Sequence, residues 1–130
     1  MQTTFVLIKP DGILRKYIGK IITRFEDRGL YISNFRSIAH PSLELTQKHY
    51  AEHIGKPFYE PITQSLSSGP VVFFQVSGID AVKIVRCLVG NTNTPGTIRG
   101  DYSCGLSHEN VVHASDSTES ADREIGLWYA

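Results

Sequence analysis

The apolar run Phe5-Val6-Leu7-Ile8 near the start of the chain constrains the fold more than any other feature of the sequence. It lies within residues 3–9, which are dense in β-branched and aromatic side chains and so predict a central β-strand. Pro10-Asp11-Gly12 follows at once and is typical of a turn. An apolar run this short cannot span a membrane or form the core of an export signal. We therefore expect a buried strand in a soluble, cytoplasmic protein.

Periodicity and turn residues divide the rest of the chain into further elements. Ile18, Ile21, Ile22 and Phe25 recur at helical spacing, and Gly29 ends that helix. Residues 91–109 show no sustained periodicity and predict a long ordered loop, of a length that is usually functional. The other predicted strands cover residues 30–38, 71–77 and 111–112. Helices are predicted over residues 43–53, 58–66 and 117–127. A further helix is capped by Asp80, carries Ile79 on its apolar face and ends at Gly90.

The order of these elements predicts the fold class. It reads βαβ, a helical pair, βαβ and a closing helix, with four strands and the helices on one side. This pattern favours an α+β fold, a ferredoxin-like sandwich with a four-stranded antiparallel sheet and covering helices. A chain of 130 residues is expected to form a single domain, residues 1–130, that needs no disulfide or metal to fold. Because such a fold hosts many functions, function has to be inferred from individual residues.

Charge and cysteine content exclude two classes of protein. The 13 acidic and 13 basic residues give zero net charge, which argues against a nucleic-acid-binding protein with a broad basic surface. The two cysteines have no CxxC spacing, so they predict neither a zinc site nor a disulfide framework. Cys87 lies in an apolar helical pattern and is expected in the core, whereas Cys104 lies in the long loop. Two free thiols suit a reducing compartment.

A histidine at the end of a strand is the strongest catalytic candidate. His113 follows a β-branched pair and precedes the polar turn Ser115-Asp116-Ser117, which opens a helix that reaches Glu124. A nucleophilic histidine is built in this way: one ring nitrogen faces the substrate, and the other donates its proton to a carboxylate. The alternative is a strand-end histidine that only forms hydrogen bonds in the core, which is the commoner case for an isolated histidine.

Three cationic residues at the ends of separate elements favour a phosphate ligand. Arg99 lies in the glycine- and threonine-rich segment 92–100, whose backbone N–H groups and hydroxyls suit phosphate. Lys9 ends the first strand, and Arg86 lies off the main apolar row of its helix. Each residue has a plain alternative as a solvated side chain or part of an ordinary loop. Together with His113 they can converge on one polyphosphate, because phosphoryl transfer needs little beyond positioning and charge neutralisation.

Aromatic residues in the middle of the chain suit a nucleobase. Phe58 begins a short helix beside a turn and is either a core residue or a stacking platform for a base. Tyr50 and His53 lie three residues apart, so on one helix they share a face. They either pack between helices or line a pocket.

Four motifs make the sequence resemble the nucleoside diphosphate kinase family. The resemblance runs from residue 3 to residue 129, and motifs of this length in this order leave little room for chance. The motifs are Lys9-Pro10-Asp11-Gly12, Ser68-Gly69-Pro70, Gly96-Thr97-Ile98-Arg99-Gly100-Asp101, and residues 110–117 followed by Glu119-Ser120-Ala121 and Glu124-Ile125.

The resemblance implies a role for each matching residue. His113 resembles the residue that becomes phosphorylated, Glu124 the carboxylate that orients it, and Ser115 the hydroxyl beside that pair. Phe58 and Ile62 match positions that contact the base. Positions that contact phosphates or ribose are matched by Lys9, Tyr50, His53, Arg86, Thr92, Arg99 and Asn110.

The resemblance also implies a reaction and its partners. A nucleoside triphosphate gives its terminal phosphate to His113, its diphosphate leaves, and an acceptor diphosphate takes the phosphate up in a ping-pong cycle. Mg²⁺ is expected to bridge phosphate oxygens of the nucleotide with few or no protein ligands. The family implies a homo-oligomer, with a hexamer favoured over a dimer or tetramer, and neither a membrane nor a nucleic acid is an expected partner.

Two other classes of protein fit the same fold. One is a binding module that senses nucleotides without turnover, and the other is an interaction protein that keeps the fold as a scaffold. Incubation with radiolabelled ATP separates them from a kinase, because an acid-labile, base-stable label on the protein indicates phosphohistidine. A hydrolase would instead release phosphate without an acceptor.

One loop departs from the family pattern and predicts an altered nucleotide preference. The segment between Thr92 and Arg99 is about four residues shorter than the common family form, a change that loop tips tolerate, and the segment from Arg99 to Asn110 is slightly longer. Because the loop frames the nucleotide, we expect a changed preference between ribose and deoxyribose forms. The measurement is the rate for matched ribo- and deoxyribonucleotide pairs, and rates equal to those of a long-loop relative would contradict this expectation.

Overall fold

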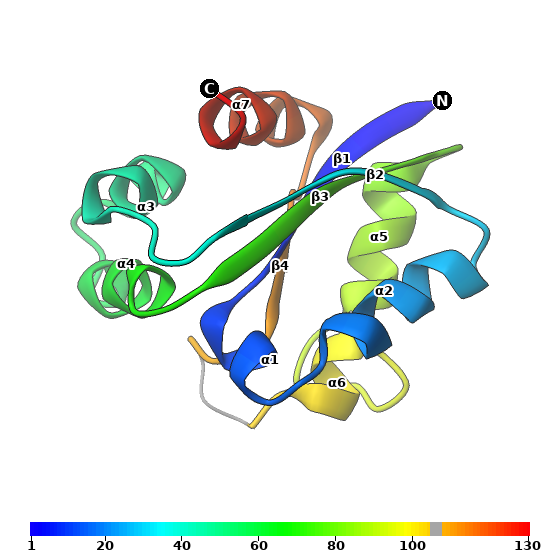
Figure 1. Ribbon diagram of the computed structural model, residues 1–130, viewed down its shortest axis with the longest axis horizontal. Helices are drawn as coiled ribbons and strands as arrows, with labels where there is room; N and C mark the ends of the chain where they lie inside the picture. The colour runs from blue at the N-terminus through cyan, green and yellow to red at the C-terminus, as the bar shows by residue number, and fades with distance from the viewer. Residues whose placement is uncertain (105–107) are drawn as a thin grey trace.

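A four-stranded sheet organises the computed structural model, which describes residues 1–104 and 108–130 (Figure 1). All three strand pairings are antiparallel, and the order across the sheet is β2-β3-β1-β4. The predicted α+β, ferredoxin-like fold is confirmed. Residues 105–107 of the predicted loop lie outside the described residues. The strands are β1 (Gln2–Ile8), β2 (Tyr31–Ile38), β3 (Val71–Gly78) and β4 (Val112–Ala114).

Helices cover both faces of the sheet, so the prediction of helices on one side is wrong (Figure 1). The reason lies in β1, where successive side chains point to opposite faces. Val6 and Ile8 belong to one buried cluster, Phe5 and Leu7 to the other, and all four are fully buried. A strand covered on both faces is expected to be continuously apolar. The first cluster is completed by α2 (Ile18–Asp27), α5 (Ala81–Val89) and α6 (Ile98–Tyr102), and the second by α3 (Leu43–His49), α4 (Tyr59–Ser67) and α7 (Thr118–Trp128).

Three segments differ from the predicted local structure. The predicted turn after β1 is the start of a short helix, α1 (Pro10–Leu14), in which proline takes the first helical position that it tolerates best. The predicted helix over residues 43–53 ends at His49, and a separate 3-10 helix, η1 (Ala51–His53), follows. The predicted loop over residues 91–109 contains α6, which is too short to show periodicity. Thr97 caps α6 by accepting a hydrogen bond from the N–H of Gly100.

Two side chains, one on α5 and one just before it, are more exposed than predicted. Cys87 is exposed, because the buried row of α5 runs through Val82, Val85 and Val89 and leaves Cys87 outside it. Ile79 precedes the helix and is 79% exposed. Asp80 occupies the N-cap position in a left-handed conformation, but its side chain makes no capping hydrogen bond.

The candidate histidine lies on β4, the edge strand that leads into α7. Strand β4 begins at Val112, one residue later than predicted, and pairs His113 with Leu7 of β1. After the strand, Ser117 caps α7 by accepting a hydrogen bond from the N–H of Ser120 at 3.0 Å. The strand end and the helix start are therefore both fixed. Among the described residues, no helix combines the length and apolar character needed to cross a bilayer.

Candidate active site

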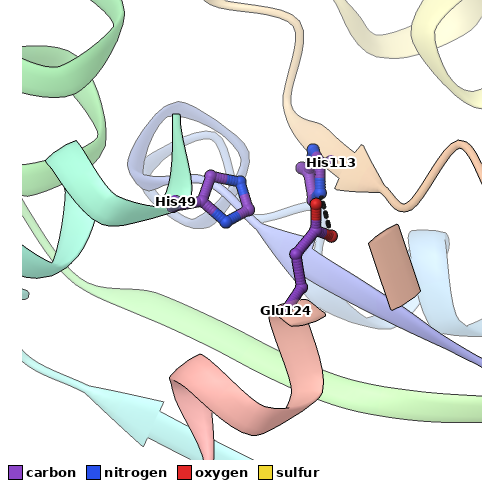
Figure 2. Close-up of side chains that lie close together, drawn as sticks. All are labelled: His49, His113 and Glu124. Carbon is purple, nitrogen blue, oxygen red and sulfur yellow. Dashed lines mark hydrogen bonds and ion pairs between the residues drawn. The ribbon is translucent and has the colours of Figure 1, made fainter. Parts of the chain in front are cut away.

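His113 and Glu124 form a hydrogen-bonded pair between β4 and α7 (Figure 2). His113 Nε2 lies 2.8 Å from Glu124 Oε1, and the Ser115 hydroxyl donates to the same oxygen at 2.6 Å. Glu124 and Ser115 are buried. Because a carboxylate only accepts hydrogen bonds, Nε2 carries the imidazole proton and the lone pair of Nδ1 is free. Figure 2 shows this second nitrogen on the side of the ring away from Glu124.

A second histidine, which sequence reasoning missed, packs against this pair. The His49 ring meets the His113 ring edge to face with centroids 4.4 Å apart, and Trp128 Nε1 donates to His49 Nδ1 at 3.0 Å. One ring nitrogen of each histidine and an oxygen of Glu124 lie within 4.8 Å of one another. His49 and Trp128 come from distant parts of the sequence, and no local spacing marks either as a site residue.

Three cationic side chains surround the strand that carries His113. Arg99 donates to Val112 O through Nε (3.2 Å) and Nη2 (2.9 Å), and Arg86 Nη1 donates to Ala114 O at 3.1 Å. These two carbonyl groups flank His113 in the sequence. Just before β4 in the sequence, the side-chain oxygen Oδ1 of Asn110 accepts a hydrogen bond from Lys9 Nζ at 2.7 Å. The predicted convergence of Lys9, Arg86 and Arg99 around His113 is present in the structure.

Burial and charge set the protonation of these groups. Burial, reinforced by Lys9, Arg99 and Arg86, holds the pKa of His113 well below its ordinary value, so its ring is neutral at pH 7. Burial and then the charge of Arg99 lower the pKa of Lys9 to about 8. Burial, followed by the charge of Arg86, lowers the pKa of Arg99 to about 10. The site therefore combines a neutral imidazole with cations that gain from a bound anion.

A cavity of about 190 Å³ opens beside His113. Tyr50 and His53 line it although they are not on one helix as predicted: Tyr50 follows α3, and His53 ends η1. Burial raises the pKa of the Tyr50 hydroxyl, so it stays neutral. The cavity also contains carboxylates that the sequence had not singled out, from Glu52 and Asp116.

The remaining predicted residues lie further from the pair. Phe58 is 44% exposed, and its ring centroid lies 5.1 Å from that of His53, which places an accessible aromatic face beside the cavity. Ile62 lies on α4 and is half-buried against the second apolar cluster. Thr92 precedes α6, and within the described part of the chain its side chain makes no hydrogen bond. The structure thus gathers His113, Glu124, Ser115, Lys9, Asn110, Arg86, Arg99, Tyr50 and His53, and brings Phe58 near them.

Comparison with known proteins identifies the family. The profile of the family described as "Nucleoside diphosphate kinase" matches residues 2–130. A nucleoside diphosphate kinase from Thermoanaerobacter sp. (strain X514) is 49% identical over 133 positions, which cover 99% of this chain and 97% of that protein. The solved nucleoside diphosphate kinase of Aquifex aeolicus superimposes with a TM-score of 0.93 at 32% identity, covering 99% of this chain and 95% of its own. The structure of the Halobacterium salinarum enzyme in complex with CDP gives a TM-score of 0.90 at 42% identity, with 98% of this chain and 86% of that one covered.

These matches agree with a site that offers a neutral imidazole to an anionic ligand. A phosphotransferase that works through a phosphohistidine needs that combination. The chain belongs to the nucleoside diphosphate kinase family.

Proposed function

We propose that His113 carries the phosphate between donor and acceptor in this nucleoside diphosphate kinase. One observation supports the assignment most directly: Nε2 is bound to Glu124, so Nδ1 is the nucleophilic nitrogen. The Nδ1 lone pair forms a bond to the terminal phosphorus of a nucleoside triphosphate. The phosphorus–oxygen bond to the leaving diphosphate breaks, and that oxygen keeps the electron pair. Attack by a second nucleoside diphosphate on phosphohistidine reverses these steps and completes a ping-pong cycle.

The surrounding residues are proposed to bind the nucleotide. Lys9, Arg86 and Arg99 neutralise charge on the phosphate oxygens. Each fixed cation is expected to stabilise the transition state by on the order of several kcal/mol, like a single preorganised hydrogen-bond donor in other active sites. Asn110, Tyr50, His53 and Thr92 are assigned to phosphate or ribose contacts. Phe58 and Ile62 are assigned to the base, and stacking on an aromatic face contributes roughly 1–3 kcal/mol with little base selectivity. The CDP bound to the Halobacterium salinarum relative supports a nucleotide at this site.

Mg²⁺ is proposed to enter with the nucleotide, bound to its phosphate oxygens. The cavity residues fit this arrangement, because Glu124 is occupied by His113 and Ser115. Glu52 and Asp116 also line the cavity and are not needed as a dedicated cage. We further infer that residues 1–130 act as one domain in the cytoplasm. The family match over residues 2–130 and the two free cysteines support this inference.

Replacement of the proposed nucleophile tests the function. His113→Ala is expected to abolish acid-labile labelling by radiolabelled ATP and all transfer to a diphosphate, because no other described group replaces Nδ1. Nucleotide binding is expected to stay nearly intact. Glu124→Ala is expected to slow transfer by up to about 100-fold, because it removes orientation but keeps the nucleophile. His40→Ala, at an exposed histidine, is the matched control. Label found by mass spectrometry on a residue other than His113 would contradict the assignment.

The lowered pKa of Lys9 predicts an alkaline limit. The ammonium is charged below about pH 8 and loses its proton as the pH rises through that value, so kcat/KM, which reports the free enzyme, is expected to fall above about pH 8. Lys9→Arg keeps a charge at higher pH and is expected to move this limit upward. The acid limit of kcat/KM reflects protonation of His113, and we expect it below 6.5, the ordinary pKa of a histidine. An alkaline limit that is unchanged in Lys9→Arg would assign it to another group.

We propose that the protein is a homo-oligomer, with a hexamer favoured and a dimer or tetramer as alternatives. Strand β2 lies at the edge of the sheet and exposes Tyr31 (68%) and Phe35 (54%), and an exposed apolar edge is a ready site for pairing with a second chain. Analytical ultracentrifugation is expected to give a multiple of 14.5 kDa, which Phe35→Lys lowers. Ile54→Lys, at an exposed apolar residue outside β2, is expected to leave the mass unchanged. A monomer for the unsubstituted protein would refute the proposal.

A further inference from the structure

A strained turn lies immediately before the strand that carries His113. Val111 has φ = 63°, is fully buried and is β-branched, a combination that is a genuine outlier among protein residues. The N–H of Val112 donates to the carbonyl of Asn110 at 2.8 Å and closes a three-residue γ-turn around Val111. A γ-turn with positive φ at its centre is rare and strained. Such strain persists only where the surroundings enforce it.

The segment that enforces this turn runs from Lys9 to Gly12. The Asp11 carboxylate accepts a hydrogen bond from the N–H of Val111 at 3.0 Å, and the N–H of Lys9 donates to the Val111 carbonyl at 2.9 Å. Both backbone polar groups of the strained residue are thus held by residues about a hundred positions away in the sequence. The Lys9 ammonium holds the Asn110 side chain on the same turn. The turn is fixed at three points by one short segment.

Gly12 allows this segment to approach so closely. A Cβ atom at this position would lie 2.7 Å from the Val111 carbonyl oxygen and 3.3 Å from Val111 Cβ, so any side chain would push α1 off the turn. The motif from Lys9 to Gly12 therefore acts through its carboxylate and its missing side chain as well as through the lysine charge.

The contacts of Asp11 exclude two simpler roles. The Lys9 ammonium donates to Asn110 rather than to Asp11, so the carboxylate is not the direct hydrogen-bonding partner of that cation. Helix α1 has only five residues, so its dipole offers little for a carboxylate to neutralise. The described hydrogen bond of the Asp11 side chain goes to the strained residue.

We propose that Asp11 is a positioning residue for phosphoryl transfer, because its carboxylate locks the γ-turn at Val111 and thereby fixes the Asn110 amide and the His113 ring. This role rests on the proposed function of His113. Asp11 itself contacts neither the nucleophile nor the cavity beside it. A displacement of about 1 Å at a reacting group can cost on the order of 100-fold in rate, which sets the size of the expected effect.

Two conservative variants separate geometry from charge. Asp11→Asn keeps an oxygen acceptor in place and loses the charge, whereas Asp11→Glu keeps the charge and displaces the acceptor. We expect the rate of His113 phosphorylation at saturating ATP to stay within about threefold in Asp11→Asn and to fall about 10- to 100-fold in Asp11→Glu, with the affinity for a nucleoside diphosphate little changed in both. The reverse order, or equal loss in both variants, would overturn the proposal. Asp27→Ala, at an exposed aspartate, is the control for substitution alone.

Relief of the strain provides a second test. Glycine adopts positive φ without a steric penalty, so Val111→Gly is expected to restore part of the rate lost in Asp11→Glu although it leaves a small cavity. A double variant no faster than Asp11→Glu would contradict a role through the turn.

Amide exchange distinguishes failure of this proposal from failure of the proposed function. Hydrogen exchange of the Val111 N–H is expected to be slow in the unsubstituted protein and in Asp11→Asn, and at least tenfold faster in Asp11→Glu. This readout does not depend on which residue is phosphorylated. Equal protection in all three proteins would refute the lock even if His113 carries the label.

Discussion

The site depends on how a three-residue edge strand is held still. Strand β4 pairs only with β1 within the described sheet, and its outer carbonyl groups would otherwise be free. Arg99 and Arg86 donate to the carbonyls of Val112 and Ala114, so guanidinium groups take the place of a further strand. Arg86 also lines the cavity beside His113, and the charges of both arginines act on the His113 ring. The nucleophile and the charges that would stabilise its reaction are therefore one connected unit, which is the arrangement that electrostatic preorganisation requires.

Gathering cations around a buried imidazole has two linked consequences. Burial and mutual repulsion disfavour the charged forms, and the shift of the Lys9 pKa from 10.5 to about 8 corresponds to a cost on the order of 3 kcal/mol. A bound polyphosphate would offset that cost, so part of the binding free energy is stored in the empty fold. The same cations keep His113 unprotonated, and an unprotonated ring nitrogen is what a nucleophile requires. A single charge arrangement thus prepares both the ligand site and the nucleophile.

Those parts of the fold and site that depend on local sequence could be predicted. The β-branched runs of β1 and β3, the strand-end position of His113 and the distance to Glu124 along α7 all follow from neighbouring residues. Features that depend on contacts between distant segments could not. His49 joins the site through contacts with distant residues, among them Phe5 and Trp128, which donates to its ring from the far end of the chain. The short helices α1 and α6 are held by tertiary packing and carry too few residues to show a period.

The hydrogen bonds behind His113 favour transfer in both directions. A carrier histidine must release its phosphate as readily as it accepts it, so the phosphorylated ring cannot be stabilised too strongly. Glu124 shares Oε1 between His113 and the Ser115 hydroxyl, and its Oε2 accepts a hydrogen bond from Arg123 Nη2 at 3.4 Å. Burial raises the pKa of Glu124, and Arg123 partly offsets that effect. Trp128 donates to Nδ1 of His49 and leaves the proton of that neutral ring on Nε2. The groups behind the nucleophile are thus neutral donors and one carboxylate paired with Arg123, while Lys9, Arg86 and Arg99 lie around the strand that carries His113. Such a division fixes the geometry of the imidazole and leaves the phosphorus–nitrogen bond free to break toward an acceptor.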